Sequence, residues 1–223
     1  MGVNAHSVDS CLYVQVDLAN RWIWRGVNYS EAPVIQPTLG YANDKLNVFI
    51  FGSCAFERRS YSEIDFSVEY QVARTLKLGF TDYFGINDSI GAKHDFLNMK
   101  RTTTMHMFDI YGIYTPSRKI PVTLLYSFWF WGADREQATL KQKFSSYLEA
   151  RYDKSYGKVK ASAFAGMTLG KGFYASRPAV VNLGVGLTKL LTVINSVAVP
   201  AKLEFVMNPE IQNVYINAII SIR

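Results

Sequence analysis

The sequence contains few of the residues from which catalytic and metal sites are usually built. Among 223 residues there are two cysteines, Cys11 and Cys54, and three histidines, His6, His94 and His106. Two cysteines cannot complete a zinc site or a disulfide framework, so we expect both to be small apolar packing residues. No serine lies in a nucleophile-elbow motif that a histidine could activate. We therefore expect no enzyme, no catalytic residues, no metal and no cofactor.

Long apolar runs and clustered charge are also missing. A membrane-spanning helix needs about 18 consecutive apolar residues, and the longest candidate, residues 120–131, is shorter and contains Pro121. The net charge is +6, but Lys and Arg are scattered, so we do not expect nucleic acid as a partner. Residues 1–10 lack the charged and apolar regions of a signal peptide, so an exported protein would already have lost its signal.

Aromatic residues are frequent, at 14%, and apolar residues alternate with polar ones along much of the chain. Residues 61–72, YSEIDFSVEYQV, show this most clearly. The apolar positions there are Ile64, Phe66, Val68 and Tyr70, and the acidic positions between them are Glu63, Asp65 and Glu69. Strict alternation predicts a β-strand with one apolar and one polar face.

Twelve such segments follow one another without a convincing amphipathic helix. They are residues 11–20, 34–42, 46–56, 61–72, 75–84, 104–114, 121–131, 143–152, 158–168, 179–189, 197–206 and 214–222. Their length, about 10 residues, exceeds the usual globular strand and matches a tilted strand that crosses a bilayer. We predict an all-β fold, a membrane-spanning antiparallel up-and-down β-barrel of about 12 strands. Residues 11–223 form this single domain, and residues 1–10 form an N-terminal tail.

The connections after the first, fifth, seventh and ninth segments are long, whereas most of those between them are short. Outer-membrane barrels have this asymmetry, so we expect residues 21–33 and 85–103 to be external loops. Aromatic residues near the segment ends are expected to form interfacial girdles. These residues are Trp22, Trp24, Tyr83, Phe84, Trp129, Trp131, Tyr152 and Tyr156.

The polar faces are expected to line an aqueous lumen. A turn at Ala73 would place Glu69 opposite Lys77, and a turn at residues 153–156 would place Glu149 opposite Lys160. Acidic and basic residues are nearly balanced, which favours a solvated wall over a catalytic or cation-binding carboxylate cluster. The candidate pore-lining residues are Asp17, Arg21, Arg25, Glu63, Asp65, Glu69, Lys77, Asp109, Lys143, Glu149, Arg151, Lys158, Lys160, Lys202 and Glu204.

One stretch resembles a known family. Residues 17–53, DLANRWIWRGVNYSEAPVIQPTLGYANDKLNVFIFGS, are similar to the start of the TorF-type porins of Gram-negative outer membranes. The segments YSEIDFSVEY, VVNLGVGLTK and VYINAIISI resemble the acidic fourth strand and the closing hairpins of that family. The resemblance implies an outer-membrane β-barrel with a pore role, a removed signal peptide and no catalytic residues.

These observations favour a small porin in the cell outer membrane that passes small polar or charged solutes through a mixed-charge lumen. Outer-membrane lipid, small solutes and other envelope proteins are the expected partners. A plugged structural or partner-binding barrel that uses its long external loops is one alternative. A soluble β-sandwich or ligand-binding β-barrel is another.

Overall fold

The computed structural model describes residues 11–57, 60–87, 94–117, 119–194 and 197–223. Twelve strands form one closed antiparallel barrel, in which each wall strand pairs with its neighbours in the chain and β1 closes on β14. The wall strands are β1 (Cys11–Ala19), β4 (Val34–Ala42), β5 (Leu46–Ala55), β6 (Tyr61–Ala73), β7 (Leu76–Asn87), β8 (His106–Tyr114), β9 (Val122–Gly132), β10 (Ser146–Tyr156), β11 (Val159–Thr168), β12 (Ala179–Ile194), β13 (Val197–Asn208) and β14 (Asn213–Ile222). No helix in the described part of the chain is long and apolar enough to span a membrane.

The predicted fold class is confirmed, and each of the twelve predicted segments corresponds to one wall strand. The alternation of side chains predicts the strands well because, along each strand, one face stays mainly apolar and the other mainly polar over many residues. The expected N-terminal tail, residues 1–10, lies outside the described residues.

Two predicted hairpin registers are wrong. Glu69 lies opposite Gly79, not Lys77, because the turn falls at residues 74–75 and the ladder shifts between Gln71 and Ala73. Glu149 lies opposite Gly166, not Lys160, because β10 continues to Tyr156 before it turns. Gly157 has a φ of 60° there, a conformation that glycine adopts without a steric penalty.

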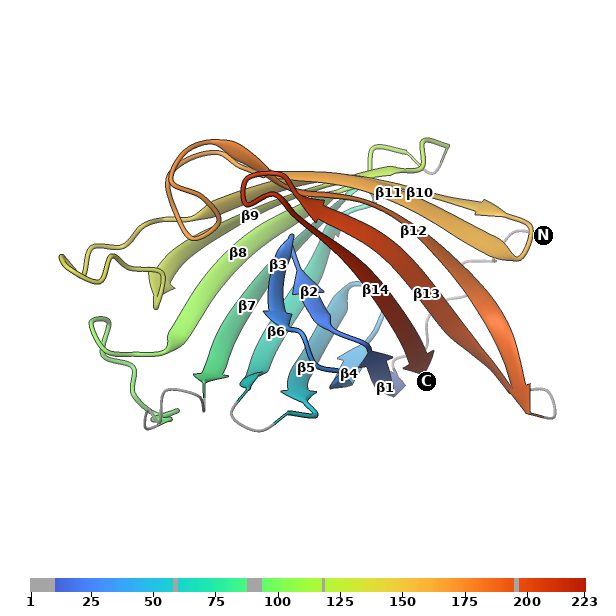
Figure 1. Ribbon diagram of the computed structural model, residues 1–223, viewed down its shortest axis with the longest axis horizontal. Coiled ribbons are helices and arrows are strands. Elements are labelled where there is room, and N and C mark those ends of the chain that lie inside the picture. Colours follow the sequence, from blue (N-terminus) through green and yellow to red (C-terminus); the bar gives the residue numbers. More distant parts are fainter. Residues whose placement is uncertain (1–10, 58–59, 88–93, 118, 195–196) are drawn as a thin grey trace.

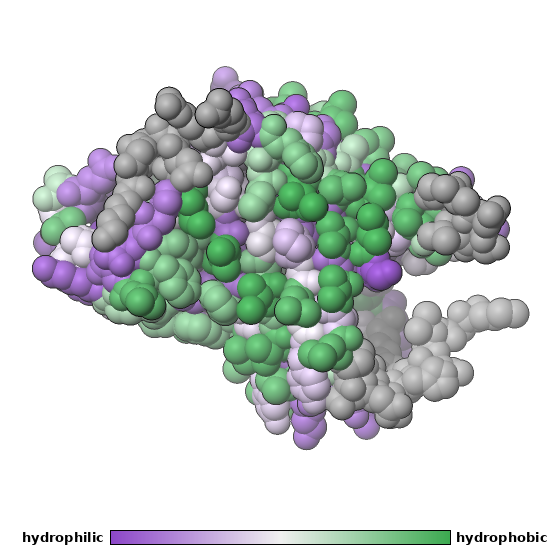
Figure 2. All heavy atoms as spheres, turned by 90° about the horizontal axis from the view of Figure 1, so that it is seen from below, coloured by the Kyte–Doolittle hydropathy of each residue, from purple (hydrophilic) through white to green (hydrophobic). Residues whose placement is uncertain are grey.

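The outer face of the barrel is apolar. Side chains that point outward from the middle of the strands are exposed, as with Ile50 at 42% and Val68 at 42%. Figure 2 shows one face of the molecule, where apolar side chains form a broad area across the middle and hydrophilic ones gather toward one end. Other exposed apolar side chains on the outer face include Val14, Leu39, Phe66, Leu78, Ile110, Leu124, Val185, Leu203, Phe205, Ile216 and Ile220.

The two ends of the barrel differ. The start of β1 and the end of β14 lie at the same end, because Val16 pairs with Ile222 in an antiparallel ladder. The short connections 43–45, 74–75 and 157–158 lie at that end, and the long connections 20–33, 133–145 and 169–178 lie at the other. We call these the terminal end and the loop end. In Figure 1 the long loops after β9 and β11 project away from the C-terminus.

The sequence predicts that the long connection between β1 and β4 is an external loop, and this prediction is wrong. It forms a second, two-stranded sheet from β2 (Trp22–Trp24) and β3 (Val27–Ser30). Figure 1 shows these two strands in blue among the wall strands. Their side chains pack against inward-facing residues of the wall, as described below. We call residues 22–30 the inner hairpin.

His106 faces outward from β8 and is fully buried. Its Nδ1 atom lies 2.9 Å from an Asp82 carboxylate oxygen, and its Nε2 atom lies 2.6 Å from the Phe96 carbonyl oxygen. The Phe96 ring packs on Phe84 and Phe66 of the outer wall. The histidine therefore fastens part of the β7–β8 connection to the outside of the barrel.

Candidate functional site

The tip of the inner hairpin is a two-residue turn in which both residues have positive φ. Trp24 pairs with Val27, and the turn residues Arg25 and Gly26 have φ values of 50° and 78°. This geometry belongs to the type I′ turn, whose twist matches that of the two strands it joins. A Cβ atom on Gly26 would lie 1.9 Å from the Val181 carbonyl oxygen, so the tip touches the backbone of β12. Only glycine fits this contact.

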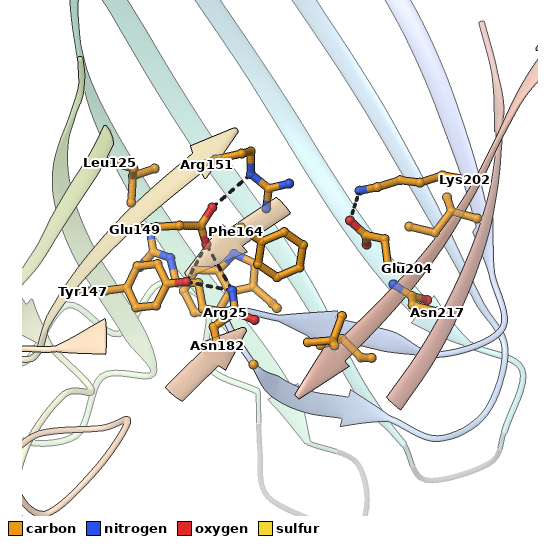
Figure 3. A pocket seen from close by; sticks show the side chains of 15 residues that line it. Arg25, Leu125, Tyr147, Glu149, Arg151, Phe164, Asn182, Lys202, Glu204 and Asn217 are labelled. Carbon is orange, nitrogen blue, oxygen red and sulfur yellow. Dashed lines mark hydrogen bonds and ion pairs between the residues drawn. The ribbon is translucent and has the colours of Figure 1, made fainter. Parts of the chain in front are cut away.

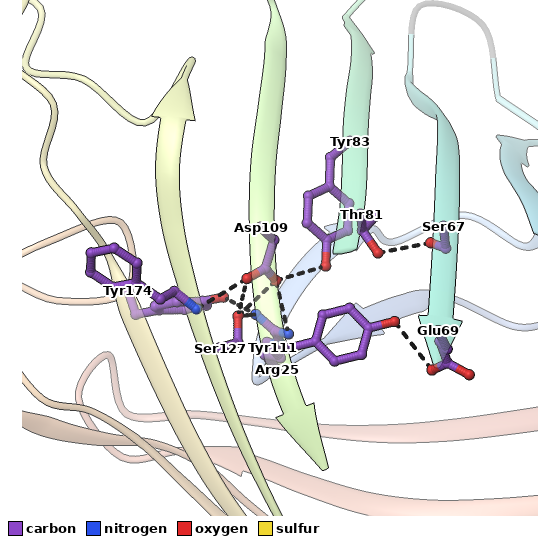
Figure 4. A network of polar contacts seen from close by, with 10 residues as sticks. Arg25, Ser67, Glu69, Thr81, Tyr83, Asp109, Tyr111, Ser127 and Tyr174 are labelled. Carbon is purple, nitrogen blue, oxygen red and sulfur yellow. Dashed lines mark hydrogen bonds and ion pairs between the residues drawn. The ribbon is translucent and has the colours of Figure 1, made fainter. Parts of the chain in front are cut away.

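Arg25 extends from the tip into a buried polar network (Figure 4). Its Nη1 atom donates to Ser127 Oγ at 2.8 Å and to the Tyr174 hydroxyl at 2.9 Å. Its Nη2 atom lies 3.5 Å from Asp109 Oδ2. The side chains of Arg25 and Asp109 are 9% and 0% exposed, so neither charge is solvated by bulk water.

Asp109 is held by further donors from the wall. It accepts hydrogen bonds from Ser127 Oγ at 2.7 Å, from the Phe128 amide at 3.0 Å and from the Tyr83 hydroxyl at 3.2 Å. These bonds hold the carboxylate in place beside Arg25. A buried charge pair of this kind is costly to break, because removal of one partner leaves the other unpaired in the interior.

Aromatic rings surround the hairpin within the barrel. Trp24 stacks on Trp129 with ring centroids 6.1 Å apart and meets Tyr83 edge-on at 5.5 Å. Trp22 packs on Tyr61 of β6 at 5.5 Å. The predicted interfacial girdle is therefore wrong for Trp22, Trp24, Tyr83 and Trp129, which lie inside the barrel. Phe84, Trp131, Tyr152 and Tyr156 face outward, and Phe84 is buried beneath Phe96.

The hairpin reaches several parts of the wall at once. Trp22 contacts β5 and β6, Arg25 contacts β8 and β9, and Gly26 contacts β12. The Asn208 side chain of β13 donates to the Gly26 carbonyl oxygen at 3.1 Å. Tyr174, which belongs to the β11–β12 loop, also packs against Trp24. The hairpin thus crosses the lumen and divides it.

Two cavities of about 310 Å³ each lie beside the hairpin, and Trp24, Arg25 and Leu125 line both. The first, shown in Figure 3, contains two ion pairs, Arg151–Glu149 at 3.0 Å and Lys202–Glu204 at 2.7 Å. We call it the balanced compartment. The second is lined by Glu63, Asp65 and Glu69 of β6 together with aromatic side chains. We call it the acidic compartment.

Most of the predicted pore-lining residues face the interior of the barrel. Glu149, Arg151, Lys202 and Glu204 line the balanced compartment, and Glu63, Asp65 and Glu69 line the acidic one. Lys77 pairs with Glu69 at 3.0 Å, a diagonal contact that the shifted register still permits. Asp109 and Arg25 form the network between the compartments.

The other predicted residues lie toward the ends of the barrel. Asp17 accepts hydrogen bonds from Gln15 on the same face of β1 at 3.0 and 3.1 Å. Arg21 lies over the Tyr215 ring at the loop end, with its guanidinium 5.8 Å from the ring centroid. Lys160 pairs with Asp153 at 3.3 Å, in a partly exposed position near the β10–β11 turn.

Two of the predicted basic residues do not lie on the lumen wall. Lys143 belongs to the β9–β10 loop, where its amide donates to the Asp134 carbonyl oxygen at 2.9 Å. Lys158 is exposed in the β10–β11 turn. Both errors follow from the placement of β10, which begins at Ser146 and ends at Tyr156, later than the alternation indicated.

The residues that hold the hairpin across the lumen could not be found from the sequence. Ser127, Tyr174 and Asn208 are neutral and carry no motif, so no local pattern marks them. The hairpin itself left a signal in WIWRGV, because two tryptophans on either side of an apolar residue suit a short strand with a buried face.

Comparisons with known proteins support the fold. No protein-family model matches the chain, and no curated protein matches it either. A solved structure from "Unveiling the Mechanism Behind the in-meso Crystallization of Membrane Proteins" is 10% identical, with a TM-score of 0.51 over 96% of this chain and 82% of that chain. The COG4313 outer membrane channel from Pseudomonas putida F1 is 14% identical, with a TM-score of 0.47 over 97% of this chain and 95% of that chain. At these identities the first likeness concerns the fold alone, and the second is too distant to carry an argument.

Proposed function

We propose that this protein is an outer-membrane β-barrel channel whose lumen is constricted by the inner hairpin. The observation that carries the proposal is the pairing of an apolar outer face with an inner face of buried polar and charged residues. A barrel with these faces suits lipid outside and water inside. Outer-membrane lipid then surrounds the barrel, and the loop end faces the exterior of the cell.

The solutes that suit this lumen are small and polar or charged. Each compartment holds only about 310 Å³, and charged side chains line both. Rings of charged side chains set the preference of a pore for its solutes. We further propose membership of the TorF-type porin family of Gram-negative bacteria, on the sequence resemblance in residues 17–53.

Conductance across a planar bilayer tests the channel function. Ala19 and Val34 are paired neighbours in the wall, so a short Gly-Ser turn can replace the inner hairpin without moving β1 or β4. We expect the full chain to give small single-channel steps and the hairpin-free variant to give steps several-fold larger. The control replaces residues 137–140, which are exposed in the β9–β10 loop, by Gly-Ser.

Each result has a definite meaning. Equal conductance of the full chain and the hairpin-free variant would show that the hairpin does not constrict the lumen. Absence of steps from the folded hairpin-free variant would overturn the channel proposal altogether. Larger steps from the control than from the full chain would assign the restriction to the β9–β10 loop instead.

A second candidate function is a plugged barrel that binds another envelope protein. The buried network between Arg25 and the wall favours it, because such a network holds the hairpin in one position. Residues 21–33 cannot serve as the contact surface in this case, since they fold inward. The described part of the β7–β8 connection, residues 94–105, remains as a contact surface, together with the β9–β10 and β11–β12 loops, which the ion pair Lys171–Glu136 joins at 3.2 Å.

A further inference from the structure

Two connections bring their basic side chains together at the loop end. Arg101 of the β7–β8 connection donates from Nη1 to the Leu140 carbonyl oxygen of the β9–β10 loop at 3.4 Å, and Arg135 Nη1 donates to the Arg101 carbonyl oxygen, also at 3.4 Å. Lys100 and Lys141, next to these contacts in the chain, are exposed. Figure 1 shows the two connections on the same side of the molecule. We call Lys100, Arg101, Arg135 and Lys141 the basic cluster.

The two arginines of the basic cluster, Arg101 and Arg135, form no ion pair within the described part of the chain. The carboxylate of Glu136, which follows Arg135, pairs with Lys171 at 3.2 Å and accepts a hydrogen bond from the Thr139 hydroxyl at 2.8 Å. Burial and the neighbouring charge of Arg101 lower the pKa of the Arg135 guanidinium, so the two like charges lie close together. Such a cluster attracts an anion.

Other basic residues at the loop end provide an internal comparison. Arg177 of the β11–β12 loop pairs with Glu210 at 3.3 Å. The guanidinium of Arg21 lies over the Tyr215 ring, 5.8 Å from its centroid. These side chains have partners within the protein itself. The unpaired positive charge is therefore a local property of the basic cluster and is not general to the loop end.

Exposed apolar side chains directly precede the basic cluster in the chain. The Phe96 ring packs on the outer wall, and Leu97 and Met99 are 84% and 52% exposed. The Lys100 amide donates to Asn98 Oδ1 at 3.0 Å, which holds the chain between the apolar and the basic positions. Phe96 lies on the wall that faces lipid in the proposed channel. Leu97 and Met99 are therefore placed where acyl chains reach them, with the basic cluster beside them.

The combination of charge and apolar surface selects the kind of partner. An apolar surface beside basic side chains suits an amphiphile that has an acyl chain and an anionic headgroup. Guanidinium groups bind phosphate through two parallel hydrogen bonds, and basic pockets at a membrane surface bind anionic headgroups. Free phosphate would make no use of the apolar side chains. A zwitterionic lipid would bring no net charge to the cluster.

We propose that this surface binds an anionic phospholipid, with the lipid phosphate against Arg101 and Arg135 and the acyl chains against Leu97 and Met99. The inference rests on the proposed function for the position of the barrel in a membrane, and it does not depend on conductance. A chain that does not insert into lipid vesicles would refute the membrane channel and this site with it. An inserted chain without a preference for anionic lipid would refute this site alone.

Quenching of Trp131 by brominated acyl chains measures the binding. Trp131 faces outward and stacks on Phe108, and Arg135 Nη1 donates to the carbonyl oxygen of the adjacent Gly132 at 3.1 Å. The remaining tryptophans lie inside the barrel, where lipid does not reach them. The full chain is reconstituted in phosphatidylcholine vesicles that contain a small fraction of either brominated phosphatidylglycerol or brominated phosphatidylcholine. We expect the brominated phosphatidylglycerol to bind at least about fivefold more tightly, the effect of one basic residue at a membrane surface.

Substitution of both arginines tests the basic cluster itself. Arg101→Gln together with Arg135→Gln should abolish the preference for phosphatidylglycerol, whereas Arg101→Lys with Arg135→Lys, which retains both charges, should keep most of it. Arg177→Gln is the matched control, since it removes one positive charge at the same end of the barrel from a side chain that is paired with Glu210. It should leave the preference unchanged. Circular dichroism establishes that each variant keeps the β-barrel.

Three results would overturn the proposal. Equal binding of the two brominated lipids to the native chain would leave the surface to the protein partner of the second candidate function. An unchanged preference in the double glutamine variant would exclude the two arginines as the site. Loss of the preference on addition of millimolar inorganic phosphate, but not of chloride at equal ionic strength, would make free phosphate the ligand. If the double glutamine variant does not fold, the comparison of the two lipids on the native chain decides alone.

Discussion

A substitution at Gly26 tests whether the inner hairpin depends on its contact with β12. In Gly26→Ala the new Cβ would meet the Val181 carbonyl oxygen at 1.9 Å, so the hairpin tip must leave the wall. Gly157→Ala is the matched control, because Gly157 also has positive φ, 60°, but no atom lies within 4 Å of the new Cβ. Positive φ alone costs roughly 1–2 kcal/mol for a residue other than glycine.

We therefore expect Gly157→Ala to lower the free energy of unfolding by about 1 kcal/mol with unchanged tryptophan fluorescence. Gly26→Ala should destabilise the protein more and alter the fluorescence of the tryptophans around the hairpin. Denaturant unfolding, followed by fluorescence, measures both quantities. Indistinguishable behaviour of the two variants would show that the tip does not depend on its contact with β12.

At this scale the sequence predicted the direction of a residue better than its partner. The alternation placed Glu63, Asp65 and Glu69 on one face, and the structure puts them there. It could not predict the contact between Arg25 and Asp109, because the two residues are 84 positions apart and meet only when the hairpin folds inward. It also treated the polar wall as one balanced surface, whereas the hairpin divides it into one compartment with paired acidic and basic residues and one lined by the three carboxyl groups of β6.

The β9–β10 loop allows a prediction at the scale of an element. Asp134 is 3% exposed and accepts hydrogen bonds from the Ser145 amide at 2.8 Å and the Ser145 hydroxyl at 2.7 Å. Burial is the largest influence on this carboxyl group and raises its pKa, although the Ser145 bonds oppose the shift. The folded loop therefore binds a proton more tightly than the open loop does.

The raised pKa of Asp134 makes the stability of the β9–β10 loop depend on pH. A raised pKa in the folded state stabilises the loop below the ordinary aspartate pKa of about 3.9, and this stabilisation is lost as the pH rises through the folded value. In the native chain we expect the loop to open more easily as the pH rises from about 3.9 through the raised pKa of Asp134. In Asp134→Asn the ease of opening should no longer depend on pH over this range. Hydrogen exchange at the Ser145 amide, corrected for intrinsic rates, measures it. Identical pH profiles would contradict the prediction.

The elements themselves were largely predictable because long strands repeat one pattern over many residues. The inner hairpin was not, since β2 and β3 have three and four residues and show too little alternation to stand out. Its two tryptophans were assigned to a membrane interface because WIWRGV indicates a short strand with a buried face but does not show that this face lies inside the barrel. β10 ends later than predicted because the turn falls at residues 157–158, where Gly157 has a φ of 60°, and not at residues 153–156.

The apolar exterior allows a prediction about the whole molecule. Val68 lies midway along β6 and is 42% exposed on the outer face, whereas Tyr156 lies next to the β10–β11 turn. In lipid, Val68→Arg should destabilise the barrel by about 2–4 kcal/mol, and Tyr156→Arg by at most about 1 kcal/mol, because the cost of charge depends on depth. Unfolding in lipid vesicles measures both values.

Equal costs for the two substitutions would contradict a lipid environment for the middle of the barrel. A protein that remains monomeric in buffer without detergent would contradict it as well, and would favour a soluble ligand-binding barrel.

The attachment of the inner hairpin has a consequence for competition. Both ends of the hairpin are fixed to β1 and β4, at the paired residues Ala19 and Val34, so a displaced hairpin stays at the loop end of the lumen. Groups tethered in this way act at an effective concentration on the order of millimolar. A solute that takes the place of Arg25 beside Asp109 must therefore outcompete a guanidinium that the chain itself keeps nearby. When the solute leaves, the lumen returns to its divided form without help from another protein.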